Sequence, residues 1–73
     1  GFCFFSNAAI AALYARSKHG AKRVAVVDFD VHHGNGTQDI FWSDKDCFYG
    51  STHQMPLFPG TGELSETGVG NIF

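Results

Sequence analysis

Two carboxylates and two histidines lie close together between Asp28 and His33. A carboxylate oxygen and an imidazole nitrogen each bind zinc at about 2.0–2.2 Å, and a catalytic zinc site uses three protein ligands and one open position. If the backbone stays extended after Val27, alternate Cα atoms lie about 6.6 Å apart and their side chains share one side. We therefore predict that Asp30 and His32 bind one divalent ion, with His33 on the other side.

A third ligand has to come from elsewhere in the fold. His53, Asp39 and Glu63 are the candidates within the chain. The competing interpretation of the motif is that its polar side chains only cap the end of a strand and a turn. We expect His33 to make a buried structural hydrogen bond rather than bind a metal, and we expect a structural role for His53 as well.

The apolar run Val24–Val27 precedes this motif and predicts a strand that is buried on both faces, as in a parallel sheet. Ligands bind outside the carboxyl ends of the strands in such sheets, which is where the motif falls. A second short strand is expected at Cys47–Ser51. The fold class predicted from this pattern is α/β with a mainly parallel sheet.

Two helices are expected beside these strands. The first covers residues 8–18 and follows an N-cap at Ser6 or Asn7. Gly20 terminates it as the left-handed residue that follows the last turn. Its apolar stripe consists of Ala9, Ile10, Leu13 and Tyr14. The second covers residues 38–42, is capped by Thr37 and turns Ile40, Phe41 and Trp42 inward. A long ordered loop follows from Thr52 onward.

Composition limits the possible functions. The net charge of −2 and the absence of a Lys/Arg run argue against nucleic acid as a partner. No apolar stretch is long enough to span a membrane and no signal-peptide pattern is present, so we expect a cytoplasmic protein without a membrane partner. Cys3 and Cys47 are expected to be reduced, buried thiols. The many aromatic residues suggest surfaces that other parts of a larger protein cover.

The full string VVDFDVHHGNGTQDIF resembles the zinc-dependent deacetylase superfamily of histone deacetylases, acetylpolyamine amidohydrolases and acetoin-utilisation proteins. The segments GFC at the start, STH at residues 51–53 and FPGTG at residues 58–62 follow in that family's order. The resemblance covers essentially all 73 residues. It implies the arginase/deacetylase-like three-layer fold, with residues 1–73 forming a central fragment of one catalytic domain that is truncated at both ends.

The resemblance also implies roles for single residues. Asp30 and His32 look like two of three ligands of zinc, or of iron(II) in its place, and the third would be an aspartate beyond Phe73. Asp28 matches the carboxylate that orients a catalytic histidine preceding this segment. Asn35 replaces the aspartate that many members have at the equivalent position near a second histidine, which favours the class II-like and bacterial branches.

Substrate and structural ions are implied in the same way. Phe2 and Phe58 match the aromatic walls of a tunnel for an acylated amine chain, and Gly1 matches a glycine near the substrate amide. Structural K⁺ or Na⁺ would bind at two sets of oxygens. The first consists of backbone oxygens of Asp28, Asp30 and His32 with Ser51, and the second of backbone oxygens of Phe41, Asp44 and Cys47.

The activity expected from this resemblance is hydrolysis of an acylated amine, such as acetyl-lysine or an acetylpolyamine, by a metal-activated water. The remainder of the catalytic domain is the necessary partner, so the 73 residues alone should be inactive. One alternative is a haloacid-dehalogenase-type phosphatase that uses Asp28 and Asp30, although His32 and His33 depart from its motif. Another is a non-catalytic metal-binding relative.

Overall fold

The computed structural model describes residues 2–73 and contains four regular elements. Helix α1 spans Asn7–Lys18, strand β1 spans Val24–Asp28, helix α2 spans Asn35–Phe41 and strand β2 spans Cys47–Ser51. Residues 52–70 form a long loop without helix or strand. The α/β fold class and the bounds of the second strand are thus as predicted.

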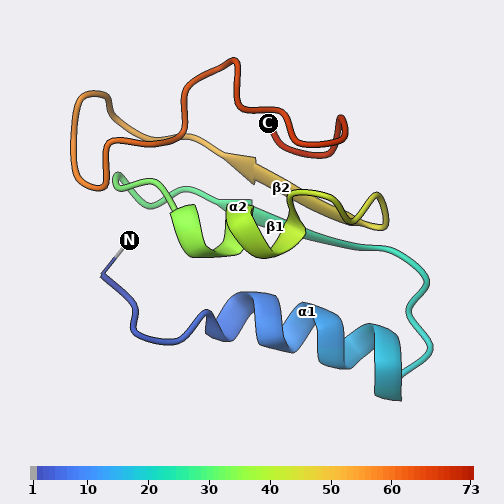
Figure 1. Cartoon of the computed structure of the whole chain (residues 1–73). Coiled ribbons are helices and arrows are strands. Elements are labelled where there is room, and N and C mark those ends of the chain that lie inside the picture. The colour runs from blue at the N-terminus through green and yellow to red at the C-terminus, as the bar shows by residue number, and fades with distance from the viewer. Residues whose placement is uncertain (1) are drawn as a thin grey trace.

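Strands β1 and β2 are parallel, and their register runs from Val24 opposite Cys47 to Asp28 opposite Ser51. The end of the chain extends this sheet, because Ile72 forms a parallel bridge with Tyr49 on the free edge of β2. Backbone hydrogen bonds of 2.8–3.0 Å join residues 71 and 73 to Tyr49 and Ser51. Figure 1 shows the chain returning alongside β2 after the long loop.

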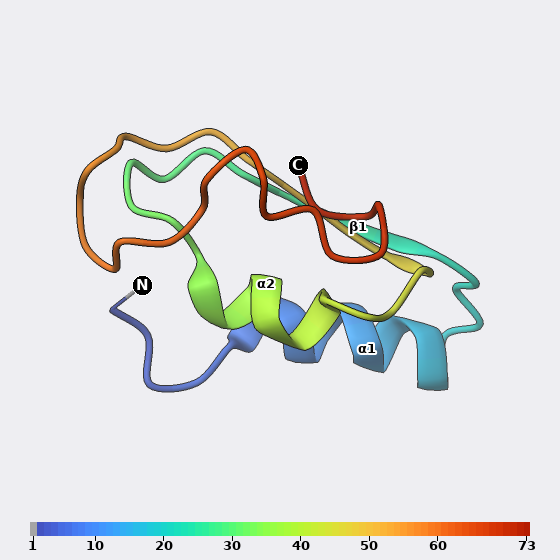
Figure 2. The same ribbon diagram turned by 45° about the horizontal axis from the view of Figure 1, so that its top comes forward.

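Both helices lie on the same side of the two strands (Figure 2). For this reason β1 alternates between half-buried and exposed residues. The prediction from its apolar run, that the strand is buried on both faces, is therefore wrong. Val24 and Val26 pack toward the helices, whereas Val27 is 73% exposed on the opposite face. Phe48 and Phe73 stack on that open face with ring centroids 5.1 Å apart.

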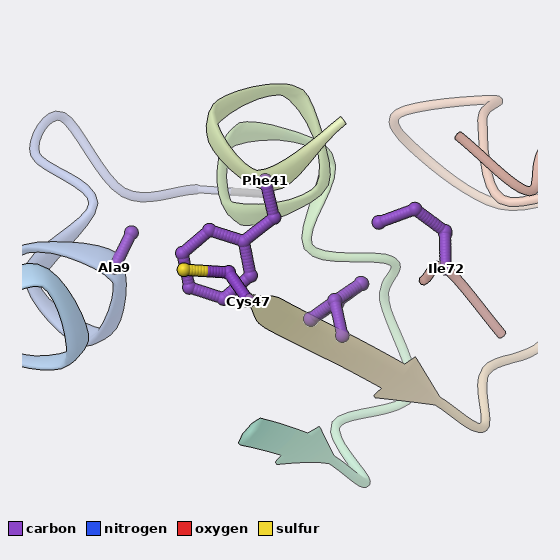
Figure 3. Packing of buried hydrophobic residues seen from close by; sticks show 5 residues of the cluster. Ala9, Phe41, Cys47 and Ile72 are labelled. Atoms are coloured by element: carbon purple, nitrogen blue, oxygen red, sulfur yellow. The ribbon is translucent and has the colours of Figure 1, made fainter. Parts of the chain in front are cut away.

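The hydrophobic core is small and lies between the helices and β2. It consists of Ala9, Phe41, Cys47, Tyr49 and Ile72, each at most 2% exposed. Figure 3 shows the ring of Phe41 pointing from α2 toward Cys47 on β2, with Ala9 of α1 to the left of both. The expected stripe on α1 is correct only for Ala9, because Ile10, Leu13 and Tyr14 are exposed. Only the small side chains of Ala9 and Ala12 pack into this core from α1.

Helix α2 begins at Asn35, three residues earlier than predicted, with Gly34 rather than Thr37 as its N-cap. Its buried residues are Gln38 and Phe41, whereas Ile40 and Trp42 are at least 40% exposed. Three consecutive residues of a helix cannot share one face, because each turn takes 3.6 residues. Residues three positions apart do share a face, which explains why Gln38 and Phe41 are both buried.

Both cysteines are free thiols, as predicted, but Cys3 is exposed and only Cys47 is buried. Within residues 2–73, no helix combines the length and apolar character that a membrane crossing needs.

Candidate active site

The carboxyl ends of β1 and β2 meet at one edge of the sheet. Asp28 is the last residue of β1 and lies opposite Ser51, the last residue of β2. The chain after β1 therefore enters the space beside the end of β2. A cavity of about 410 Å³ opens there, lined by residues of the chain start, the end of β1 and the start of α2.

Asp30 and His32 lie side by side on this cavity, with Oδ1 of Asp30 and Nδ1 of His32 3.6 Å apart. Two ligand atoms at zinc distances and a tetrahedral angle are about 3.4 Å apart. The two donor atoms thus have a spacing that a single zinc ion could bridge. They are also reached by solvent, since the two side chains are 68% and 31% exposed.

The backbone reaches this arrangement by a different route from the extended pleat that we predicted. Strand β1 ends at Asp28, and residues 31 and 32 form a bend. Oδ1 of Asp28 accepts the N–H of Asp30 at 3.0 Å, and Oδ1 of Asp30 accepts the N–H of His32 at 2.8 Å. Each aspartate thus bonds the backbone two residues on, as in an Asx turn. The side chains converge because of these turns.

Tyr49 is a site residue that sequence reasoning missed. Its buried hydroxyl donates to Oδ2 of Asp28 at 2.8 Å and accepts the N–H of Gly34 at 3.1 Å. Burial raises the pKa of Tyr49 to about 12, and the nearby Asp28 carboxylate adds to the rise while Ser51 opposes it. The phenol therefore stays protonated and holds Asp28 in place. A buried Tyr in an apolar strand was the available signal, since its hydroxyl needs a partner.

Gly34 is packed too closely for any side chain. A Cβ atom on this residue would collide with the hydroxyl of Tyr49 and lie 2.9 Å from Oδ2 of Asp28. The close approach of its backbone is what allows the N–H to reach the phenol. The glycine thus keeps β1, β2 and the start of α2 in contact at the cavity.

The structure gathers no third ligand beside Asp30 and His32 from its own side chains. Within residues 2–73 no group of three His, Cys, Asp or Glu residues is placed to hold a metal ion. His53 is engaged elsewhere, since its ring bonds Ser51 and the carbonyl of Gly62. Asp39 and Glu63 are exposed residues that do not line the cavity.

His33 is buried and points away from the cavity, as predicted. Its Nε2 lies 2.8 Å from Oε1 of Gln38, and its Nδ1 lies 2.7 Å from the hydroxyl of Thr61. The amide oxygen of Gln38 can only accept, so Nε2 carries the proton and Nδ1 accepts from Thr61. Burial lowers the pKa of His33, in keeping with a neutral ring. The segment that carries Asp30 and His32 is thereby tied to the loop that carries Phe58.

Glu66 also connects α2 to the long loop. Its Oε1 accepts hydrogen bonds from Nε2 of Gln38 at 2.7 Å and from the N–H of Gly62 at 2.9 Å, and its Oε2 accepts the N–H of Glu63 at 3.1 Å. The N–H of Gly62 and then the Gln38 amide are the main causes that lower the pKa of Glu66. One carboxylate thus holds a turn of the long loop against α2.

Phe2 and Phe58, the expected tunnel walls, both line the cavity. Their ring centroids are 4.8 Å apart at an interplanar angle of 31°, and the Phe2 ring also contacts His32 edge-on at 4.8 Å. The two phenyl rings therefore touch each other and leave no gap for a chain between them. Asn35 lines the same cavity, whereas Gly1 lies outside the described residues.

The two sets of oxygens expected for monovalent cations differ in their surroundings. In the first set, Ser51 Oγ lies 2.8 Å from Nδ1 of His53, whose Nε2 lies 2.7 Å from the carbonyl of Gly62. Nε2 must donate to that carbonyl, so Nδ1 accepts the Ser51 proton and lone pairs of Oγ stay available. In the second set, the carbonyl oxygens face the amide nitrogen of Asn71.

Comparison with known proteins places these features in a family. The model of the histone deacetylase domain matches residues 1–72. "Histone deacetylase 10, chloroplastic" of Oryza sativa subsp. japonica is 58% identical over 71 residues, which are 97% of this chain and 16% of that protein. A "Probable deacetylase" of Methanothermobacter thermautotrophicus is 58% identical over 96% of this chain and 22% of its own length.

Solved structures show the same relationship. The acetylpolyamine aminohydrolase of Burkholderia pseudomallei superposes with a TM-score of 0.89 and 42% identity, covering 99% of this chain and 22% of that one. A histone deacetylase homologue from Aquifex aeolicus gives a TM-score of 0.89 at 37% identity, covering 99% and 21%. The chain thus spans about a fifth of the length of the proteins that it matches. With its parallel sheet and its deacetylase-like fold, the chain belongs to the histone deacetylase family.

Proposed function

We propose that the protein containing this chain is a metal-dependent amide hydrolase that removes the acyl group from an acylated amine. The observation that carries the proposal is the 3.6 Å separation of Oδ1 of Asp30 and Nδ1 of His32 on an open cavity. Relatives named as deacetylases support this general activity. Acetyl-lysine, acetylpolyamines and similar amides are the substrate classes that we propose.

In this proposal Asp30 and His32 supply two ligands for Zn²⁺ or Fe²⁺, and an aspartate from the rest of the domain supplies the third. When bound, such an ion would polarise the acyl carbonyl and acidify a water molecule. Structural K⁺ or Na⁺ is proposed at the backbone oxygens of Asp28, Asp30 and His32 together with Ser51. The resemblance to the family and the donor types of these residues support the assignments.

The other residues of the cavity act on protons and on the substrate. Asp28, held by Tyr49, would accept the N–H of a histidine from the preceding part of the domain and raise its basicity. Asn35 would lie near a second such histidine without giving it a charge. Phe2 and Phe58 would part to admit the methylene chain of the amine, and Gly1 would lie near its amide.

The remainder of the catalytic domain is therefore the partner that this chain requires, and we propose that residues 1–73 are a central part of a single domain and inactive alone. No nucleic acid or membrane partner is proposed. We propose the cytoplasm as its compartment, although the rice relative's name places that protein in the chloroplast. The family match does not favour the phosphatase alternative.

Metal analysis of the full-length protein tests the proposal. We expect Asp30→Ala and His32→Ala to lose bound zinc, because each removes one of three ligands. Asp39→Ala and His19→Ala remove the same side-chain types from exposed positions outside the cavity and should keep it. Retention of stoichiometric zinc by both Asp30→Ala and His32→Ala would contradict the assignment.

Activity separates the remaining alternatives. The wild-type protein should release acetate from an acetyl-lysine peptide or an acetylated polyamine, and a hydroxamate should inhibit that release. A non-catalytic relative would bind zinc and hydrolyse neither substrate. An aspartyl-phosphate analogue formed by beryllofluoride at Asp28 would instead support the phosphatase.

A further inference from the structure

Three backbone carbonyl oxygens converge on one atom where α2 ends and β2 begins. The amide nitrogen Nδ2 of Asn71 lies 2.7 Å from the oxygen of Phe41, 2.8 Å from that of Asp44 and 2.7 Å from that of Cys47. The three residues are evenly spaced in sequence, and Asn71 itself is only 6% exposed. A buried point between α2 and β2 is therefore surrounded by acceptors.

The chemistry of the amide fixes its orientation. Oδ1 of Asn71 accepts the N–H of Val69 at 3.2 Å, which leaves Nδ2 toward the three carbonyls. The opposite orientation would place an oxygen against three oxygens. An amide NH₂ carries two hydrogens, so it cannot give each of the three carbonyls a hydrogen bond of its own. Two of the carbonyl oxygens have a further donor, since that of Phe41 accepts the N–H of Asp44 at 3.1 Å and that of Asp44 accepts the N–H of Cys47 at 3.0 Å.

The convergence of three carbonyl oxygens on one point is typical of a cation site. Potassium is bound in proteins by rings of backbone carbonyls that replace its hydration shell. The carbonyls at the end of a helix also carry partial negative charge, and Phe41 is the last residue of α2. The same three oxygens are the set that the family resemblance predicts for a second structural cation. Here Nδ2 stands at the point on which they converge.

The long loop is shaped to deliver this side chain. Gly68 and Gly70 have positive φ angles of 56° and 91° on either side of Val69. A Cβ atom on Gly68 would lie 2.8 Å from Oδ1 of Asn71 and 2.5 Å from the carbonyl oxygen of Trp42. The N–H of Val69 also bonds that carbonyl at 3.1 Å. The turn therefore fits closely around the amide and the end of α2.

The positively charged side chain of Arg16 also contacts the segment between α2 and β2. Nη1 of Arg16 donates to Oδ2 of Asp44 at 2.7 Å and to Sγ of Cys47 at 3.3 Å, and Nη2 lies 3.6 Å from Oδ2 of Asp46. Burial alone would raise the pKa of Asp44, but hydrogen bonds from Asp46, Arg16 and Cys47 lower it overall. The acidic turn thus has a fixed cation of its own.

We propose that the amide nitrogen of Asn71 replaces the second monovalent cation in this protein, so that no ion binds at the carbonyls of Phe41, Asp44 and Cys47. The ion and the amide nitrogen require the same position, and the loop closes over the amide. The first cation set at Asp28 and Ser51 is unaffected. This inference does not depend on deacetylase activity.

Thallium(I), a heavy substitute for potassium, provides the direct test in crystals of the full-length protein. We expect no anomalous peak among the three carbonyls of the wild type. Asn71→Ala removes the amide and leaves room, so a peak should appear there. A thallium ion bound by the three carbonyls of the wild type, with the amide displaced, would overturn the proposal.

Thermal unfolding gives a second readout with a matched control. Asn71→Ala should melt at a higher temperature in potassium chloride than in tetramethylammonium chloride, by a larger margin than the wild type. Asn71→Leu also removes the donor but fills the space, so it should be destabilised without gaining potassium dependence. An equal response of both variants to potassium would contradict the inference. If neither variant folds, the thallium result for the wild type decides alone.

Discussion

The phenol of Tyr49 and the carboxylate of Asp28 are joined by a hydrogen bond of 2.8 Å, although 21 residues separate them in the chain. The bond crosses from β2 to the end of β1, and the same hydroxyl accepts the N–H of Gly34. A buried core residue thus fixes the first polar residue of the candidate active site. Stability and site geometry are coupled through this one group.

Tyr49→Phe should therefore reduce the stability of the full-length protein. The change leaves the N–H of Gly34 without its acceptor and Oδ2 of Asp28 without the phenol donor, and a buried unsatisfied group costs about 1–3 kcal/mol. Urea denaturation gives the change in the free energy of unfolding. Tyr14→Phe removes a hydroxyl from an exposed tyrosine and should change it by less than about 0.5 kcal/mol. Equal values for the two variants would refute the coupling.

A side chain at Gly62 should disrupt the contact between the buried ring of His33 and the half-buried ring of His53. Gly62 has a φ of +90°, and a Cβ atom there would collide with Nε2 of His53 and lie 2.6 Å from the ring of His33. Gly62→Ala should cost about 1–2 kcal/mol for the left-handed backbone and about 1–3 kcal/mol more for overpacking. Thermal or urea unfolding of the full-length protein measures the sum.

Gly60→Ala is the matched control for that variant. Gly60 has a φ of +80°, but a Cβ atom added there would meet nothing within 4 Å, so only the backbone cost applies. The difference between the two variants isolates the crowding against the histidines. Should Gly60→Ala prove as destabilising as Gly62→Ala, the packing around His33 and His53 contributes nothing.

Acid should weaken the loop through Glu66. Its folded pKa lies below the ordinary value of 4.5, because the N–H of Gly62, the Gln38 amide and the N–H of Glu63 bond the charged form. The unfolded chain therefore binds the proton more readily. The stabilisation is present above 4.5 and is lost as the pH falls from there through the folded pKa.

Unfolding free energies measured at a series of pH values on both sides of 4.5 check this expectation. Glu66→Gln should be less stable than the wild type near neutral pH and should lose less stability on acidification. Glu63→Gln removes an exposed carboxylate from the same turn and should follow the wild-type curve. A Glu66→Gln curve parallel to the wild type would show that the carboxylate does not hold the loop.

The sequence predicted the features that depend on neighbours in the chain. The bounds of β2 follow from a local apolar run and agree with the structure. The predicted extent of α1 differs from the observed helix by one residue, although Ser6 forms no side-chain cap hydrogen bond. The approach of Asp30 to His32 was also predictable, because only one residue separates them. The Asx turns that produce it were not predicted, since an extended strand accounts for the same spacing.

Features that depend on distant partners were missed. Apolar spacing on α1 favoured Ile10 and Tyr14 as core residues, but the sheet is approached closely by the small side chains of Ala9 and Ala12 instead. The roles of Tyr49 and Asn71 rest on contacts across 21 to 30 residues. No local pattern encodes such a pairing, because it exists only once the strands and the long loop have assembled.

The alternating exposure of β1 has a consequence for how this segment can evolve. If the strand gained or lost one residue between Val24 and Asp28, every side chain after the change would turn to the opposite face. The carboxylate would then leave Tyr49, and Val27 would take its place after a gain or Phe29 after a loss, although the composition would hardly change. Insertions and deletions should therefore be tolerated in the exposed part of the long loop and excluded from these five residues.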